Sequence, residues 1–232
     1  MFGCYAFPSH VGVHHPEIPM GLDVPTVLDT LRADPAGYAV TYAQGCPVLG
    51  GDDVGIAAAA FAASNADVCV AVLGDRAGLF GAGTSGEGCD ATSLRLPGRQ
   101  AELLEALLAT GTPVVLVLLV GRPYELCGQA SRLAAAVCGF YPGEEGATAL
   151  ADILSGRVNP SGRLPVSFPG ADSNQPATYL APAPGQLSTV SNVDPTPVFP
   201  FGHGSPTRRS PGSASPAGPH RSGRPTGTAR WR

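Results

Sequence analysis

Three short stretches of the chain are almost wholly apolar, and they predict buried β-strands. They span residues 68–73, 114–120 and 136–141, and polar side chains do not alternate with apolar ones along them. A strand that is covered on both faces has this pattern, whereas a strand with one face in water alternates. A weaker strand is predicted for residues 38–42.

Helices are predicted between these strands. Residues 56–64 are rich in alanine, and a second helix is expected to begin at Pro97, which suits a first helical position, and to end by Gly111. A third is predicted for residues 144–155, with two glutamates in its first turn. Strands that alternate with helices in this way predict an α/β fold, a three-layer α/β/α sandwich with a mostly parallel sheet.

Two segments do not follow this alternation. Residues 74–96 are rich in glycine and show neither helical nor strand periodicity, and a long irregular loop inside a domain is often functional. Residues 205–232 consist mostly of serine, proline, glycine, threonine and arginine. Because this tail has too few apolar residues to form a core, we expect it to be disordered.

Charge and hydropathy give no support for a nucleic-acid partner or a membrane partner. All 14 basic residues are arginine, and six of them lie in the tail, so residues 1–204 hold eight arginines against all 18 acidic residues. An acidic body of this kind gives no reason to expect nucleic-acid binding. No apolar run is long enough to cross a membrane, and the first residues lack the layout of a signal peptide. We therefore expect a cytoplasmic protein without a membrane partner.

Cysteine spacing argues against a metal site. The six cysteines include no pair at C-x-x-C spacing, and no histidine lies at a zinc-finger interval from them. Cys69 and Cys138 lie inside predicted strands, so we interpret the cysteines as buried free thiols. No metal and no cofactor is predicted.

A glycine motif in the 74–96 loop does not predict a dinucleotide site. Residues 81–86 formally match G-x-G-x-x-G and follow a strand. That fingerprint must open a helix at once, so that the helix N-terminus faces the pyrophosphate. Here the next predicted helix begins about ten residues later, which the Rossmann arrangement does not allow.

Glu87 is the candidate catalytic residue of the same loop. It lies between Gly86 and Gly88, and Asp90 follows. On chemistry alone a solvated surface acid is the favoured interpretation, because glycoside hydrolysis needs two carboxyl groups and this is one.

Eight sequence pieces in a fixed order resemble the C-terminal domain of family 3 glycoside hydrolases, the group of β-glucosidases and β-xylosidases. The resemblance covers residues 1–204. The pieces are Gly-Asp-Arg at 74–76, Gly-Glu-Gly-Cys-Asp at 86–90, Leu-Pro-Gly-Arg-Gln at 96–100, Gly-Arg-Pro at 121–123, Tyr-Pro-Gly-Glu-Glu-Gly at 141–146, Ala-Asp-Ile-Leu-Ser-Gly at 151–156, Asn-Pro-Ser-Gly-Arg-Leu-Pro at 159–165 and Phe-Pro-Phe-Gly-His-Gly at 199–204.

The resemblance implies a fold, a partner domain and a role for Glu87. In the family, the α/β/α domain lies beside a (β/α)₈ barrel that carries an aspartate nucleophile, and a loop of the α/β/α domain supplies the acid/base. The matching residue here is Glu87. Asp75, Arg76 and Asp90 would support this loop or the substrate-binding site around it. The implied substrate is a terminal β-linked glucoside or xyloside, hydrolysed with retention.

The chain also departs from the family pattern. Its 232 residues contain no set of eight βα units, so we expect a fragment that is inactive without a barrel. A truncated first strand region is left open. A non-catalytic remnant that binds a carbohydrate or a partner is the alternative. After Gly204 the family pattern gives way abruptly to the arginine-rich tail, which we interpret as a frame change or truncation, with a genuine tether as the alternative.

Overall fold

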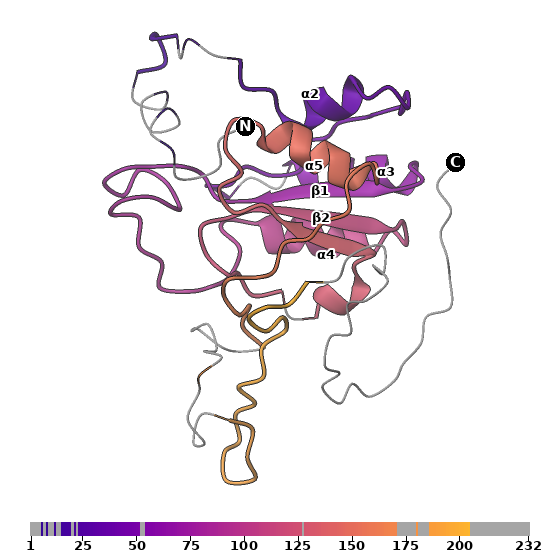
Figure 1. The fold of residues 1–232 in the computed structure, drawn as a ribbon. Coiled ribbons are helices and arrows are strands. Elements are labelled where there is room, and N and C mark those ends of the chain that lie inside the picture. The colour runs from indigo at the N-terminus through magenta and orange to yellow at the C-terminus, as the bar shows by residue number, and fades with distance from the viewer. Residues whose placement is uncertain are drawn as a thin grey trace.

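A parallel three-stranded sheet lies at the centre of the molecule, in the strand order β1-β2-β3 (Figure 1). The computed structural model describes residues 6, 8, 12, 15–19, 21, 23–51, 54–126, 128–170, 180 and 186–204, so the predicted disordered tail, 205–232, lies outside the described residues. In chain order the elements are α2 (Val27–Arg32), α3 (Val54–Ser64), β1 (Cys69–Gly74), α4 (Gln100–Leu108), β2 (Val114–Leu119), the 3₁₀ helix η1 (Ala130–Arg132), β3 (Ala135–Cys138) and α5 (Gly146–Leu154).

The three predicted strands are confirmed, and all of their pairings are parallel. Cys69 of β1 lies opposite Val114 of β2, and Val115 of β2 lies opposite Ala135 of β3. The predicted strand at 38–42 is wrong: this segment pairs with no described strand, and Tyr38 and Tyr42 are exposed. Without a neighbouring strand, its backbone N–H and C=O groups have no ladder to join.

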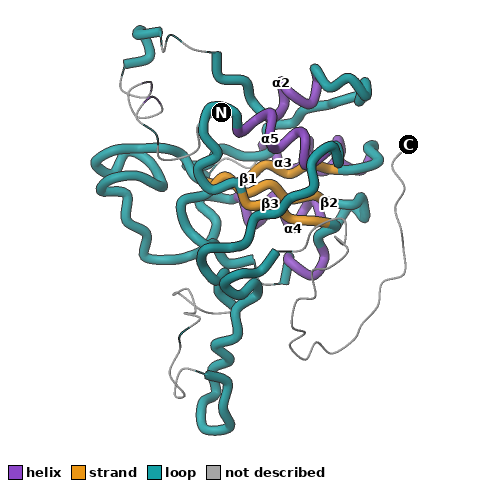
Figure 2. The backbone as a smooth tube through the Cα atoms, in the orientation of Figure 1, coloured by secondary structure: helices purple, strands orange, loops and turns teal. Residues whose placement is uncertain are grey.

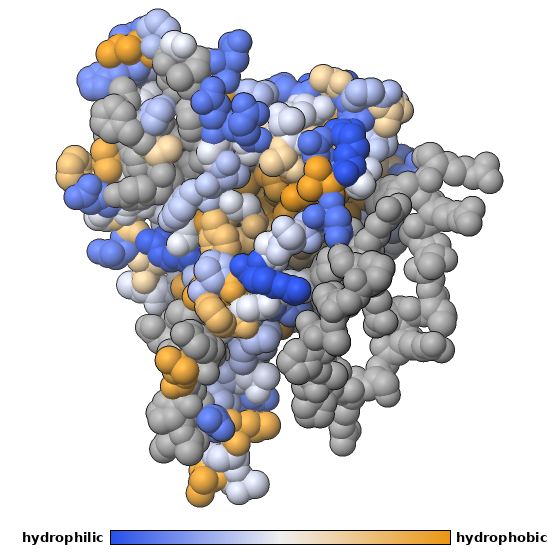
Figure 3. Space-filling view, in the orientation of Figure 1, coloured by the Kyte–Doolittle hydropathy of each residue, from blue (hydrophilic) through white to orange (hydrophobic). Residues whose placement is uncertain are grey.

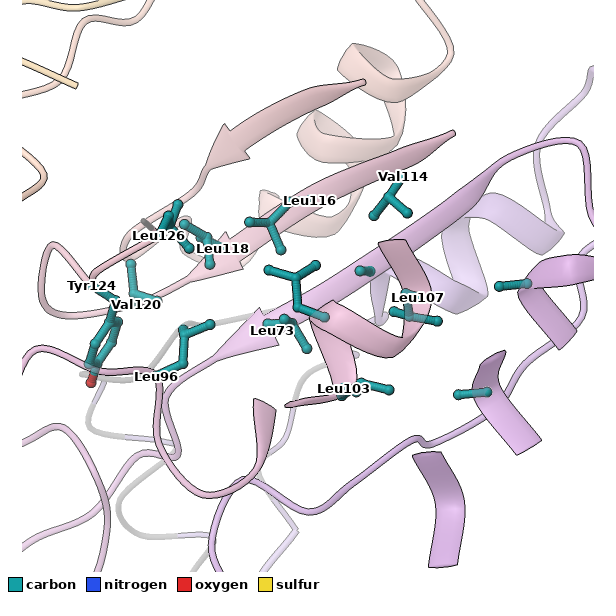
Figure 4. Packing of buried hydrophobic residues seen from close by; sticks show 14 of the residues in the cluster. Leu73, Leu96, Leu103, Leu107, Val114, Leu116, Leu118, Val120, Tyr124 and Leu126 are labelled. Carbon is teal, nitrogen blue, oxygen red and sulfur yellow. The ribbon is translucent and has the colours of Figure 1, made fainter. Parts of the chain in front are cut away.

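Helices cover both faces of the sheet, which confirms the predicted α/β sandwich (Figure 2). One face packs on α3 and α4 in a core of leucine and valine side chains, seen from close by in Figure 4. On the other face a smaller cluster joins Val117 of β2 to Val27 of α2 and Leu150 of α5. Within the described part of the chain, no helix is long and apolar enough to span a membrane.

Helix α4 begins three residues later than predicted. Gly98 adopts φ +59, in the left-handed region, which prevents the helix from starting at Pro97. The first helical residue is therefore Gln100, whose buried side chain accepts a hydrogen bond from Gly74 N (2.7 Å) and donates one to Gly74 O (2.8 Å). This contact joins the start of α4 to the end of β1.

Helix α5 begins at Gly146, so its two predicted first-turn glutamates, Glu144 and Glu145, lie before it. Gly143, at φ +74, forms the turn that delays the start. The end is as predicted, because Gly156 follows the last turn with φ +75 and donates to Ile153 O.

Helix α2 was not predicted from the sequence. Its start is a capping box: the Thr26 hydroxyl accepts from Asp29 N at 3.1 Å, and the Asp29 carboxylate accepts from Thr26 N at 2.9 Å.

The cysteine prediction is confirmed in part. Cys46, Cys69, Cys89 and Cys138 are free thiols, but only Cys89 is fully buried. Burial raises the pKa of Cys69.

Candidate active-site loop

The loop that carries Glu87 leaves the carboxyl end of β1 and returns to the body of the domain at the start of α4. It contains neither a helix nor a strand, as predicted, but it is folded on itself. Gly78 N donates to Ser85 O at 3.1 Å and Thr84 N to Arg76 O at 2.9 Å. In open α/β sheets, ligands bind outside the carboxyl ends of the strands, which is where this loop lies.

Close packing of glycines makes the fold of the loop possible. A Cβ atom added to Gly78 would lie 2.2 Å from Gly83 N, and one added to Gly83 would lie 2.6 Å from Gly78 N. The two backbones can approach so closely only because neither residue has a side chain.

Asp75 lies at the base of the loop and joins it to the segment that follows β2. Its Oδ1 atom accepts hydrogen bonds from Thr84 Oγ1 at 2.7 Å and from the Tyr124 hydroxyl, and its Oδ2 atom accepts from Gly121 N at 2.8 Å. The carboxyl ends of β1 and β2 adjoin in a parallel sheet, so these groups meet although they lie far apart in the sequence. Tyr124 and Leu96 are visible at this end of the sheet in Figure 4.

Tyr124 is held as a neutral donor. Burial raises the pKa of its phenol, and the hydrogen bond to Asp75 and the negative charge of Asp75 raise it further. The phenol therefore stays protonated at ordinary pH and donates to the Asp75 carboxylate.

Arg122 contacts the loop at two points. Its Nη1 atom donates to Thr84 O at 2.5 Å, and its Nη2 atom donates to Cys89 O. The Gly-Arg-Pro piece at 121–123 is part of the family pattern, but no role was predicted for Arg122. No local signal could have predicted one, because its two acceptors lie 38 and 33 residues away.

Glu87 is exposed, and a backbone hydrogen bond holds its main chain in place. Its carbonyl oxygen accepts a hydrogen bond from Phe80 N at 2.8 Å. Phe80 itself has φ 53, uncommon for a residue with a side chain, and the residue is 83% exposed. Arg76 and Asp90, the other predicted support residues, are also exposed. Of the predicted support residues, Asp75 is the one whose side chain holds the loop through a described hydrogen bond.

Asp75 also lines a small cavity. Its volume is about 170 Å³, and it lies between β1, α4 and the segment around residues 44–48. Ligand pockets usually have about 300–1,000 Å³, so this space is smaller than a typical ligand pocket. No group of three or more His, Cys, Asp or Glu side chains suited to a metal occurs among the described residues.

Several large apolar side chains are exposed on the described surface. Besides Phe80 they include Phe61 on α3, 73% exposed, and Val72 on β1, 44% exposed. In the face shown in Figure 3, apolar and polar residues are interspersed among the described residues.

The chain matches a known family over most of its length. Residues 9–206 match the glycosyl hydrolase family 3 C-terminal domain. A β-xylosidase from Formosa agariphila is 36% identical over 184 residues, which are 77% of this chain and 25% of the relative. A periplasmic β-glucosidase from Salmonella typhimurium is 37% identical over 137 residues, 53% of this chain and 17% of that protein.

Solved structures agree with this match. The structure of a β-glucosidase from Erythrobacter marinus superposes with a TM-score of 0.63 at 33% identity, covering 88% of this chain and 30% of that one. A β-glucosidase from Listeria innocua in complex with isofagomine gives 0.65 at 27% identity, over 79% of this chain and 26% of that one. The chain spans about a quarter of the length of the first of its curated relatives. This chain belongs to glycosyl hydrolase family 3, and what it contains is the C-terminal domain of that family.

Proposed function

We propose that this chain supplies the general acid/base, Glu87, of a retaining, exo-acting β-glycosidase that releases terminal β-linked glucose or xylose. Its relatives are β-glucosidases and β-xylosidases, which supports this class of substrate. The reaction needs a second carboxylate, the nucleophile. We propose that this comes from a (β/α)₈ barrel, which the matched residues do not include.

The chemistry assigned to Glu87 has two steps. While the barrel aspartate attacks the anomeric carbon, the protonated Glu87 carboxyl donates its proton to the leaving oxygen. The resulting Glu87 carboxylate then accepts a proton from water, which attacks the covalent glycosyl-enzyme and releases the sugar. The sugar thus leaves with its original anomeric configuration.

The observation that carries the proposal is the difference between the acids of the 75–96 loop. Asp75, Glu87 and Asp90 are the three acids of this segment. The Asp75 carboxylate is half-buried and accepts hydrogen bonds from Thr84, Gly121 and Tyr124, so it is engaged in holding the loop. Glu87 is exposed and lies between the two carbonyls that Arg122 contacts, whereas Asp90 lies beyond them. Glu87 is therefore the acid that is both accessible and held in place.

The test combines this chain with a separately made family 3 barrel. Hydrolysis of aryl β-glucoside and β-xyloside is measured for the chain alone, the barrel alone and the mixture. We expect activity only in the mixture, its loss with Glu87→Gln, and its retention with the matched control Glu105→Gln, which changes an exposed glutamate of α4 outside the loop. Binding of sugar or barrel without turnover would favour the non-catalytic alternative. Full activity of the Glu87→Gln mixture would contradict the proposal.

A further inference from the structure

The loop that carries Glu87 has contacts on both sides of that residue with a single guanidinium group. Thr84 lies three residues before Glu87 and Cys89 two residues after it. Arg122 donates from Nη1 to the Thr84 carbonyl at 2.5 Å and from Nη2 to the Cys89 carbonyl. One guanidinium group thus joins the two ends of segment 84–89, and Glu87 lies between them.

Arg122 is itself fixed in place. It follows directly after Gly121, whose N–H donates to Asp75 at 2.8 Å, and it precedes Tyr124, whose hydroxyl donates to the same carboxylate. Beyond it, Glu125 N donates to Leu94 O at 2.7 Å. The segment 121–125 therefore contacts the loop at three places: at Asp75, at segment 84–89, and at Leu94 near its return to the body of the domain.

The side-chain chemistry of this bridge requires arginine. Both acceptors are neutral backbone carbonyls, and two N–H groups of one planar fork reach them at the same time. An ammonium group carries the same charge on a single nitrogen, so it cannot reproduce the geometry of the fork. A lysine at this position would keep the charge and lose the bridge.

We infer that Arg122 is the positioning residue of the acid/base loop: by bridging the Thr84 and Cys89 carbonyls it holds the Glu87 carboxyl where it can exchange a proton with the leaving oxygen. The inference rests on the proposed function. In this assignment Arg122 acts through Glu87 and does not itself take part in the proton transfer. A misplacement of about 1 Å at a reacting group can cost about 100-fold in rate.

The first measurement is hydrogen exchange on the chain as it exists. In Arg122→Lys, the amides of residues 84–89 should exchange faster, while those of β1 and β2 should keep their protection. The matched control is Arg157→Lys. Arg157 also bridges two partners, Asp34 and Asp152, at distances of 2.6 and 2.8 Å, but it does so away from the loop. That control should leave the exchange of residues 84–89 unchanged.

The second measurement is the dependence of rate on the leaving group, with the chain and the barrel combined. Arg122→Lys should lower the rate about 10–100-fold for alkyl glycosides, which need a proton, and much less for aryl glycosides with acidic phenols. A purely structural role would lower all rates alike. In the same preparation, Glu87→Gln separates the two hypotheses, because an unchanged leaving-group dependence in that variant contradicts the proposed function itself.

Three results would overturn the inference about Arg122. They are unchanged exchange at 84–89 in Arg122→Lys, a uniform loss of rate for all leaving groups while Glu87→Gln is selective, and loss of protection throughout the sheet. The last would mean that Arg122 holds the fold and not the loop.

Discussion

Strand β2 and the 75–96 loop are held in place by different forces. Five of the six residues of β2 are buried, and their side chains pack on helices from both sides. The loop buries Cys89, Leu94 and Leu96. Its segment around the exposed Glu87 is held by hydrogen bonds to Asp75 and Arg122. Apolar burial thus builds the frame of this domain, and a few long-range polar contacts shape the part that we assign to chemistry.

The largest effect is expected from a substitution in the buried strand β2, which belongs to the frame of the domain. Leu116 is fully buried in β2, so Leu116→Ala should lower the free energy of unfolding by about 2–5 kcal/mol. The control Val72→Ala removes a side chain that is 44% exposed and should cost much less. Urea unfolding followed by circular dichroism measures both. Equal losses in the two variants would contradict the assignment of the core.

A second substitution should damage the loop and spare the frame. Gly78→Ala places a Cβ 2.2 Å from Gly83 N, so the loop backbone must shift, at a cost of about 1–3 kcal/mol. Hydrogen exchange should rise within residues 76–90 and stay low in β1 and β2. Gly162→Ala meets nothing within 4 Å and serves as the control. Normal protection of the loop in Gly78→Ala would show that the glycine contact is not needed.

The frame was predictable from the sequence because its signals are local. Three apolar runs identified β1, β2 and β3, and Pro97 and Gly111 indicated the helix that became α4. Helix α2 carried a signal too, the Thr26-x-x-Asp29 capping box, which lies outside the apolar runs that guided the prediction. Predicted boundaries were wrong where a left-handed glycine, Gly98 or Gly143, delayed a helix.

The arrangement of the loop could not be predicted in the same way. Its contacts with Gly121, Arg122 and Tyr124 join residues 33 to 49 positions apart, so they depend on which strands are neighbours in the sheet. Family resemblance identified Glu87 as a candidate, and the piece containing Arg122 was noticed, but nothing in the sequence paired Arg122 with Thr84 and Cys89. The 38–42 prediction failed for a related reason, since strand pattern alone does not supply a partner strand.

The smallest expected effect concerns pH and a contact remote from the loop. A hydrogen bond from Ala36 N, then one from Arg157, lowers the pKa of Asp34 below 3.8. A carboxyl group whose pKa is lower in the folded than in the unfolded protein stabilises the fold at pH values above its unfolded pKa. This stabilisation is lost as the pH falls through its folded pKa. Asp34→Asn should therefore lessen the loss of stability below about pH 4. Arg157→Met should do so less, because Ala36 N remains.

The same two variants also test whether the loop is independent of the contact between Asp34 and Arg157. Neither variant should change hydrogen exchange in the 75–96 loop, because Asp34 and Arg157 join α2 to the end of α5. Faster exchange of the loop in Asp34→Asn would show that the two regions are coupled.

The most direct test of the central claim is azide rescue of Glu87→Ala in the chain combined with a family 3 barrel. An aryl glycoside with an acidic phenol forms the glycosyl-enzyme without a proton donor, but its release by water needs a base. The account predicts that turnover falls about 10²–10⁴-fold, that the intermediate accumulates, and that azide restores turnover with formation of a β-glycosyl azide. A Glu87→Ala enzyme that turns over within a few-fold of the parent for every leaving group, and forms no glycosyl azide, would contradict it.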